Sequence, residues 1–272
     1  MINKKDLCIR DPYIYEEQGT YYLYGTIVVN NKMNKFCCYK SKDLNEFEGP
    51  IILFEPDEKF WADRDYWAPE LHKYNNKYYL FGSLKSNNRC RGTQIFVSDK
   101  PDGNFVPLTK YPITPNDWEC LDGTLYVENE TPYIIFCREW LEINDGEIYI
   151  MELAKDLTKP ANEPLKLFSA SEAKWPVSIK DEGNFVTDGP FIIKKKDKLQ
   201  MIWSSFSSNG YAIALCESKS IFGPWVHKEK PIFEKDGGHA MVFDFKGSPM
   251  MAYHYPNGPE NQERLQFVPY DY

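Results

Sequence analysis

Five short polar motifs recur along the chain at nearly even spacing, each at the start of a strand-like run. Measured between Asp11, Ala68, Asp122, Asp188 and His239, the steps are 57, 54, 66 and 51 residues. A repeat of about 40–50 residues that contains several short strands is typical of a propeller blade. The innermost strand of every blade lines one central channel, so we expect the five motifs to meet at a single cavity. The motifs are Arg10-Asp11-Pro12, Trp67-Ala68-Pro69-Glu70, Leu121-Asp122-Gly123, Thr187-Asp188-Gly189-Pro190 and Gly237-Gly238-His239.

Each motif introduces the same succession of short runs. After Asp11, for example, an aromatic run is followed by a turn at 18–20 and a second run at 21–25. Short β-branched and aromatic runs separated by Gly, Asn and Lys turns predict hairpins. A third run recurs in three repeats, and a fourth, Pro-containing run at 49–54 and again at 230–233 suits an outer edge strand. We therefore predict an all-β fold, a five-bladed β-propeller with four antiparallel strands per blade.

Bulk composition fits this fold and narrows the partners. Aromatic residues make up 16% of the 272 residues, enough to fill the wedges between radially packed sheets. The net charge of −8 without a basic stripe disfavours a nucleic-acid partner, and no apolar run is long enough for a membrane span. Seven cysteines without regular spacing predict reduced thiols. We expect one domain over 1–272, cytoplasmic as the chain stands unless an export signal has been removed.

Three motifs place an Asp at what we take to be equivalent positions: Asp11, Asp122 and Asp188. Taken singly, Asp-Pro and Asp-Gly are ordinary turn sequences, but three copies in phase with the blade repeat favour a shared site. Cleavage of a glycosidic bond needs one ionised carboxylate to deprotonate water and one protonated carboxyl to protonate the leaving oxygen. A third carboxylate nearby can raise the pKa of the acid by like-charge repulsion. These residues therefore predict a glycosidase.

Taken together, the five motifs resemble glycoside hydrolase family 43, from Asp11 to about Tyr255. The resemblance implies a five-bladed propeller that cleaves arabinose-, xylose- or galactose-containing glycans with inversion. It also implies that Asp11 is the general base, Asp122 the pKa modulator that orients the acid, and Asp188 the general acid. The family usually has Glu before Gly-Pro at the acid position, whereas this chain has the shorter Asp188. Glu70 and Glu139 are the alternative acids.

We expect further side chains near the motifs to bind the oligo- or polysaccharide substrate. They are Arg10, Trp67, Glu70, Arg138, Glu139, Trp140 and His239. No metal ligand set and no required cofactor are predicted. The resemblance leaves open a calcium ion near His239, and hydrogen bonding of His239 to a carboxylate or to substrate is the alternative. Exo action is expected, because loops at 30–34, 57–65 and 140–146 could close one end of the channel.

Two rival functions stay open at the level of sequence. One is a retaining, fructosidase-like propeller enzyme, in which Arg-Asp-Pro is also a typical motif, although in a later blade than here. The other is a non-catalytic sugar-binding propeller whose acid has decayed to Asp188.

Overall fold

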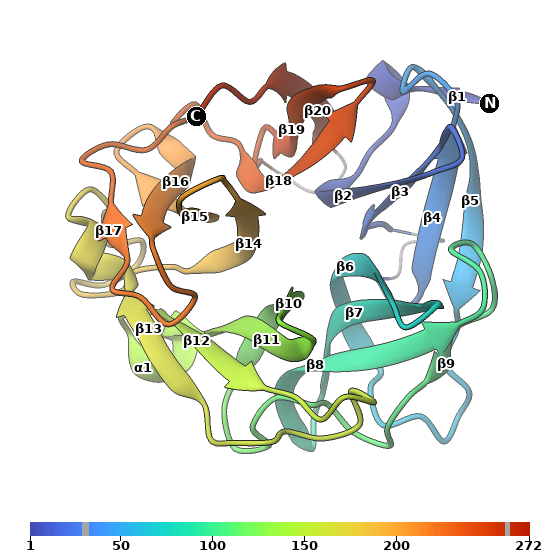
Figure 1. Cartoon of the computed structure of the whole chain (residues 1–272), viewed down its shortest axis with the longest axis horizontal. Coiled ribbons are helices and arrows are strands. Elements are labelled where there is room, and N and C mark those ends of the chain that lie inside the picture. Colours follow the sequence, from blue (N-terminus) through green and yellow to red (C-terminus); the bar gives the residue numbers. More distant parts are fainter. Residues whose placement is uncertain (29–32, 259–261) are drawn as a thin grey trace.

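The computed structural model describes residues 1–28, 33–258 and 262–272. Within these residues, five small antiparallel sheets stand around a central axis, with β2, β6, β10, β14 and β18 as their innermost strands (Figure 1). The prediction of an all-β, five-bladed propeller is confirmed. In sheet order, the first blade contains β1 (Ile2–Asn3), β5 (Glu46–Phe54), β4 (Phe36–Ser41), β3 (Thr20–Thr26) and β2 (Arg10–Glu17). The second blade contains β6 (Arg64–Tyr74), β7 (Lys77–Ser86), β8 (Arg89–Ser98) and β9 (Val106–Pro107), and the third contains β10 (Cys120–Glu128), β11 (Thr131–Arg138), β12 (Glu147–Glu152) and β13 (Leu165–Ser169). The fourth blade contains β14 (Asp188–Lys194), β15 (Leu199–Ser207), β16 (Gly210–Ser218) and β17 (Val226–His227), and the fifth contains β18 (Gly238–Phe245), β19 (Ser248–Tyr255) and β20 (Arg264–Pro269). The described helical segments are α1 (Trp140–Ile143) and two 3₁₀ turns, η1 (Lys4–Asp6) and η2 (Ala170–Ala173).

The number of strands per blade departs from four at the two ends of the chain. The first blade has five strands because β1 pairs with the outer edge of β5, and the last blade has three. The run at 230–233 is not the outer strand of the fourth blade, because β17 takes that place. Within that run, Ile232 and Phe233 hydrogen-bond to the Ile213 backbone, and Phe233 forms an isolated bridge with it beside β16.

Residues near the N-terminus close the ring against the last blade. Cys8 forms an antiparallel bridge with Arg264, and the Ile9 N–H donates to the Glu263 carbonyl at 3.4 Å. The free edge of the three-stranded blade is therefore partly covered by a segment made more than 250 residues earlier. This contact joins the first blade to the fifth.

Five buried clusters hold neighbouring blades together, one in each wedge between them. In the wedge between the third and fourth blades, for example, Phe168 packs against the fully buried Trp203. This arrangement confirms that most aromatic side chains form the inter-blade core. All seven cysteines are free thiols, as expected from their spacing.

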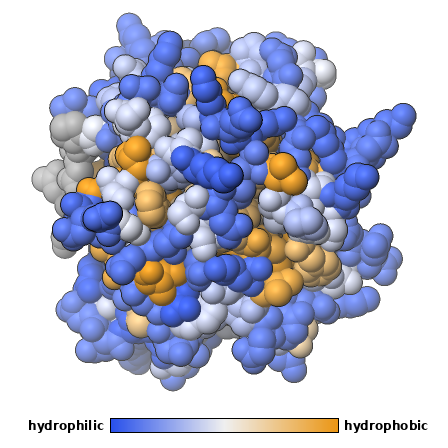
Figure 2. Space-filling model, turned by 90° about the vertical axis from the view of Figure 1, so that its left-hand side faces the viewer, coloured by the Kyte–Doolittle hydropathy of each residue, from blue (hydrophilic) through white to orange (hydrophobic). Residues whose placement is uncertain are grey.

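One side of the ring has a mostly polar surface. Figure 2 shows the side that carries β13 and β17 as largely hydrophilic, with apolar residues in small separate groups. Among the described residues, no helix is long and apolar enough to cross a membrane.

Candidate active site

Every inner strand is interrupted by a β-bulge at its motif. In each blade the pairing between the first and second strands shifts register at this point. One residue of each bulge has left-handed backbone, which is costly for residues with a side chain and is often found at functional sites. These residues, with their φ values, are Asp11 (52°), Ala68 (44°), Asp122 (54°), Gly189 (53°) and His239 (50°).

The bulges correct the expectation that the three Asp residues are equivalent. Asp188 pairs with Ser204 in the register that joins Arg10 to Thr26. Asp188 therefore stands one residue before the bulge position, which Gly189 occupies. A Cβ at this position would lie 2.8 Å from the ring of the neighbouring blade's histidine. Glycine is required there, so the acidic side chain comes from the preceding residue.

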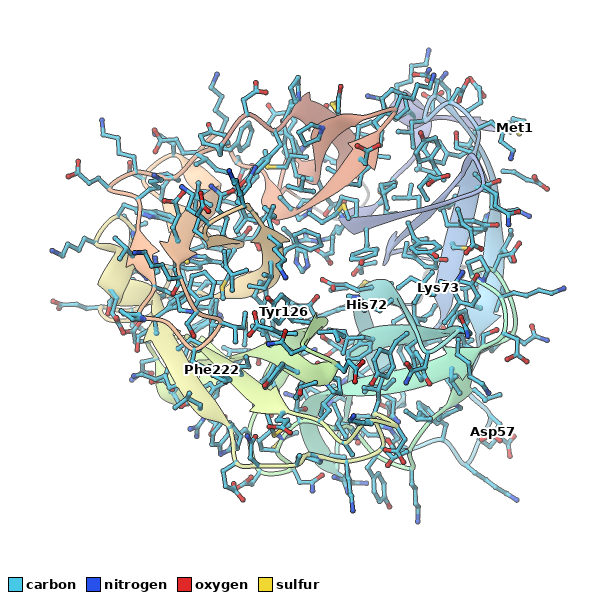
Figure 3. All side chains as sticks on the ribbon, viewed as in Figure 1. Met1, Asp57, His72, Lys73, Tyr126 and Phe222 are labelled. Carbon is cyan, nitrogen blue, oxygen red and sulfur yellow. The ribbon has the colours of Figure 1, made fainter. Side chains whose placement is uncertain are left out.

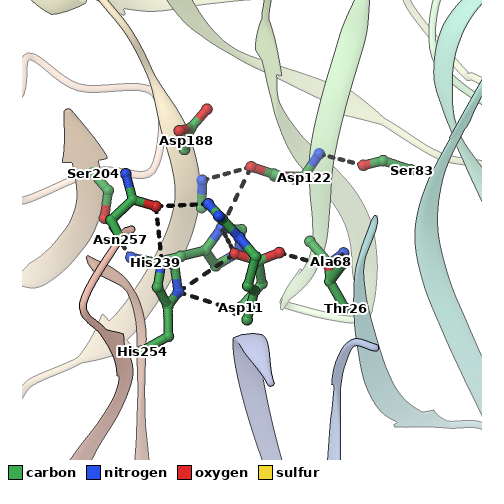
Figure 4. Close-up of polar contacts among 12 residues, drawn as sticks. Asp11, Thr26, Ala68, Ser83, Asp122, Asp188, Ser204, His239, His254 and Asn257 are labelled. Atoms are coloured by element: carbon green, nitrogen blue, oxygen red, sulfur yellow. Dashed lines mark hydrogen bonds and ion pairs between the residues drawn. The ribbon is translucent and has the colours of Figure 1, made fainter. Parts of the chain in front are cut away.

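Hydrogen bonds between blades fix four of these bulges. In each, the backbone N–H of the bulge residue donates to a side chain on the second strand of the preceding blade (Figure 4). The pairs are Ala68 with Thr26 Oγ1 (2.8 Å), Asp122 with Ser83 Oγ (2.8 Å), His239 with Ser204 Oγ (2.8 Å) and Asp11 with His254 Nδ1 (3.2 Å).

The fourth blade differs, and the difference joins two of the predicted catalytic residues. The position on the preceding blade whose side chain would accept this hydrogen bond is occupied by Cys137, which pairs with Leu121 in the third blade. Its thiol is a weak acceptor. The Gly189 N–H donates instead to Asp122 Oδ2 at 3.0 Å. Asp122 is therefore bound to the residue that directly follows Asp188.

The bulges surround one cavity of about 390 Å³, within the range of small-molecule sites. Eight of the ten predicted site residues line it: Asp11, Asp122, Asp188, Arg10, Trp67, Glu139, Trp140 and His239. The three carboxylates, which come from the first, third and fourth blades, thus share one opening.

The other two predicted site residues lie outside the cavity lining. Glu70 is buried and lies 3.2 Å from the Nε2 atom of His72, whose side chain is near the centre of the ring (Figure 3). Arg138 stacks its guanidinium 4.1 Å from the centre of the Trp118 ring and pairs with Glu142. Both side chains are occupied by these neighbours.

The predicted loops contribute unequally to the cavity. Met33, from the first loop, and Trp140 and Leu141, from the third, line it. Asp57, at the start of the second loop, lies at the outer edge of the ring (Figure 3). Within the first loop, 30–32 fall outside the described residues.

Asp11 is held as a carboxylate by its neighbours. Its Oδ1 atom lies 3.3 Å from His239 Nδ1, and its Oδ2 accepts from the Thr26 hydroxyl at 2.6 Å. Burial opposes ionisation, but His239, His254, Arg10 and Thr26 together outweigh it, so the pKa of Asp11 lies below its usual value. A carboxylate that stays ionised can act as a general base.

The pKa values of Asp122 and Asp188 are shifted upward, in the direction opposite to that of Asp11. Burial first, and then the charge of Asp11, raise the pKa of Asp122 well above its usual value. Burial and then the charge of Asp122 raise the pKa of Asp188 to about 7, although a hydrogen bond from Tyr211 opposes the rise. Of these three carboxyl groups, Asp11 is therefore held ionised, whereas Asp122 and Asp188 keep a proton more readily than usual, as cleavage of a glycosidic bond requires.

Glu139 belongs to a charged wall between the second and third blades. Its Oε1 atom accepts from Arg91 Nε at 3.2 Å, and the Arg91 guanidinium stacks 3.8 Å from the centre of the Trp67 ring. The Oε2 atom of Glu139 is buried and has no hydrogen-bond partner among the described residues. Burial outweighs the attraction of Arg91, so the pKa of Glu139 is raised.

Four residues that contribute to the site lie outside the motifs and were not predicted from the sequence: Glu263, Asn257, His254 and Tyr211. Arg10 donates to Glu263 Oε1 at 3.0 Å and to Asn257 Oδ1 at 2.6 Å. His254 accepts the Asp11 N–H through Nδ1 and faces Asn257 through Nε2, and burial lowers its pKa to about 4, so it is neutral. The fourth is Tyr211, which lines the cavity beside Asp188. Only His254 had a sequence signal, since the hairpin register pairs it with the fifth motif.

The donor set near His239 does not fit a protein-built calcium site. Calcium prefers six to eight oxygen ligands, and the described residues contain no group of three or more His, Cys, Asp or Glu side chains that could hold a metal ion. The His239 Nδ1 atom already faces Asp11 and Asp122 at 3.3 and 3.7 Å. We therefore assign no chemical step to a metal, and calcium near His239 stays a prediction.

Comparisons with known proteins give one consistent result. The model of a family described as glycosyl hydrolases family 43 matches residues 6–267. The chain is 44% identical to a crystal structure described as an endo-arabinase from Bacteroides thetaiotaomicron, with a TM-score of 0.91 over all of this chain and 97% of that one. It is 22% identical to a xylosidase/arabinosidase of Bacteroides ovatus, over 90% of this chain and 85% of that protein. It is also 22% identical to the extracellular endo-α-(1→5)-L-arabinanase 2 of Bacillus subtilis, of which it spans about half (54%) while 88% of this chain is covered.

Proposed function

This chain belongs to glycosyl hydrolases family 43, and we propose that it hydrolyses arabinose-containing glycans with inversion at the anomeric carbon. One observation carries the proposal: carboxyl groups with opposite pKa shifts, Asp11 lowered and Asp188 raised to about 7, line the same cavity. Inverting hydrolysis needs an ionised base on one face of the sugar and a protonated acid on the other.

In this mechanism Asp11 accepts a proton from water as the water attacks the anomeric carbon. Asp188 gives its proton to the departing glycosidic oxygen. Asp122 raises the pKa of Asp188 and, through its hydrogen bond from the Gly189 N–H, fixes the backbone beside the acid. Xylose- and galactose-containing glycans are the other substrates expected for such a site.

Asp188 is preferred over the two glutamates as the acid. Glu70 lies outside the cavity lining and faces His72. Glu139 lines the cavity and burial raises its pKa, but Arg91 holds its Oε1 atom and opposes this rise, whereas the pKa of Asp188 reaches about 7. We assign Glu139 to binding a sugar hydroxyl through Oε2, which has no hydrogen-bond partner among the described residues.

Proton NMR of the first-formed product tests the reaction. Linear arabinan, arabinoxylan and aryl α-L-arabinofuranosides are the substrates, and Asp11→Asn is the inactive control. A first product of inverted configuration supports the proposal, whereas retained configuration indicates a fructosidase-like mechanism. Turnover by Asp188→Glu when the parent releases no sugar would indicate a sugar-binding propeller with a decayed acid.

The mode of cleavage has two candidates. Exo action is the mode we propose, because Trp140 and Leu141 wall one side of the cavity. Endo action is the second candidate, because the 44% identical relative is described as an endo-arabinase. Chromatography of early products from linear arabinan separates them: arabinose alone supports exo cleavage, and a ladder of oligosaccharides supports endo cleavage.

A further inference from the structure

Tyr211 is a buried cavity residue to which neither the motifs nor the proposed mechanism gives a role. It is the second residue of β16 and is only 3% exposed. Its hydroxyl donates a hydrogen bond of 2.8 Å to Asp188 Oδ2. Both side chains belong to the fourth blade, on β14 and β16.

Several contacts hold the Tyr211 ring in one place. Its backbone N–H donates to Asp236 Oδ1 at 3.3 Å, and its ring stacks on the His254 ring at 5.8 Å with 23° between the planes. Across the ring stands Gly238, where a Cβ would lie only 2.4 Å from two Tyr211 ring atoms. The absence of a side chain at Gly238 therefore makes room for the tyrosine.

We propose that Tyr211 is the positioning residue of the general acid, and that it leaves Oδ1 of Asp188 as the atom that carries the transferred proton. A phenol O–H that donates to Oδ2 occupies that oxygen with a proton of its own. Burial raises the pKa of Tyr211 well above its usual value, so the phenol does not lose this proton in the working range. The proton of the acid then resides on Oδ1 and passes from Oδ1 to the leaving oxygen, while Oδ2 keeps its hydrogen bond.

This role matters because of the chain's departure from the usual glutamate. An Asp carboxyl has one rotatable bond fewer than a Glu carboxyl and sits about 1 Å further back, a displacement that can cost on the order of 10²-fold in rate. A fixed donor on one oxygen limits rotation of the group, so the shorter acid is at least held in a single orientation.

The proposal also fixes the direction of a pH effect. A hydrogen bond to the charged form of a carboxyl lowers its pKa, so loss of the Tyr211 hydroxyl should raise the pKa of Asp188. The titratable or charged groups that face this pair are Arg10 and Asp11 from β2, Asp122 from β10, Cys137 from β11, His239 from β18, His254 from β19 and Asp236, which precedes β18. All of them stay in place when only the hydroxyl is removed.

The test compares Tyr211→Phe with Tyr24→Phe. The control removes a buried hydroxyl that donates to the Pro101 carbonyl at 2.6 Å, away from the cavity. We expect Tyr211→Phe to lower kcat on an arabino-oligosaccharide by roughly 10- to 100-fold with KM nearly unchanged. The loss should be much smaller on a dinitrophenyl arabinoside, which needs little acid assistance. The alkaline limb of the pH profile should move up by roughly half to one unit. Tyr24→Phe should change none of these.

Two further measurements keep the proposal falsifiable. In the Asp188→Asn background, Tyr211→Phe should change the residual rate by less than about twofold, because a residue that acts through Asp188 has nothing left to position. If Tyr211→Phe does not fold, 3-fluorotyrosine at this site, a stronger donor of nearly equal size, should move the alkaline limb down instead. Equal losses on both substrates, or a limb that does not move, would overturn the proposal. The inference rests on the proposed function, and a wild-type chain inactive on every substrate would refute that function instead.

Discussion

Replacement of Asp188 by Asn should stabilise the protein at alkaline pH and have little effect at acidic pH. The pKa of Asp188 is about 7 in the folded protein, against about 3.9 in an unfolded chain. The difference of about three units corresponds to about 4 kcal/mol at ~1.36 kcal/mol per unit. This figure is an upper limit, because the charge of Asp122 contributes to the shift and the two groups titrate together.

The sign follows from proton binding. Between about pH 4 and pH 7 the folded protein keeps a proton on Asp188 that the unfolded chain has lost. The free energy of unfolding of the wild type therefore falls as pH rises through this window and levels off above it. Asn cannot ionise, yet its side-chain oxygen can still accept the hydrogen bond from Tyr211, so the variant lacks only the electrostatic cost.

Urea unfolding followed by circular dichroism, at pH values from about 4 to 8.5, measures this effect. The free energy of unfolding of Asp188→Asn minus that of the wild type should grow by up to about 4 kcal/mol across the range. Asp197→Asn, in the exposed turn after β14, is the matched control and should show a constant difference. A difference for Asp188→Asn that is also independent of pH would refute the reasoning.

Three further predictions concern catalysis. Asp11→Asn should abolish turnover while leaving the melting temperature and the affinity for arabino-oligosaccharides, measured by calorimetry, nearly unchanged; turnover equal to wild type would remove Asp11 from the mechanism. The kcat/KM of the wild type should fall as pH rises through about 7, because Asp188 loses its proton there. It should stay high down to below pH 4, because the pKa of Asp11 is lowered. A rate that climbs above pH 7 would contradict these assignments. Cys137→Ser should provide a hydroxyl acceptor for the Gly189 N–H in competition with Asp122 and lower kcat severalfold, and a kcat equal to that of wild type would show that the hydrogen bond from Gly189 to Asp122 is dispensable.

The motifs predicted the number of blades and most of the cavity because both depend on local sequence. A bulge needs a residue that tolerates left-handed backbone, and Asp11 and Asp122 mark two of these bulges directly. The prediction that Asp188 occupies the same position as Asp11 and Asp122 was wrong by one residue, because the bulge position beside His239 admits only glycine.

Contacts made across blades could not be predicted in this way. Tyr211 lies in a third strand with no motif, and its place depends on the empty space above Gly238 in the next blade. Glu263 reaches Arg10 only because the ring closes, over a separation of 253 residues. Arg138 carried charge next to a motif-like segment, but its stacking on Trp118 directs it away from the cavity.

The seam between the first and last blades has a consequence for biosynthesis. Arg10 is synthesised 253 residues before Glu263, which binds its guanidinium, and Cys8 likewise precedes Arg264, with which it forms a bridge. The substrate cavity is therefore unfinished on every incomplete nascent chain, and four finished blades should have no partial activity. Hydrolysis should begin only when the β19–β20 hairpin docks. The time at which activity appears during translation therefore reports when the fold is completed.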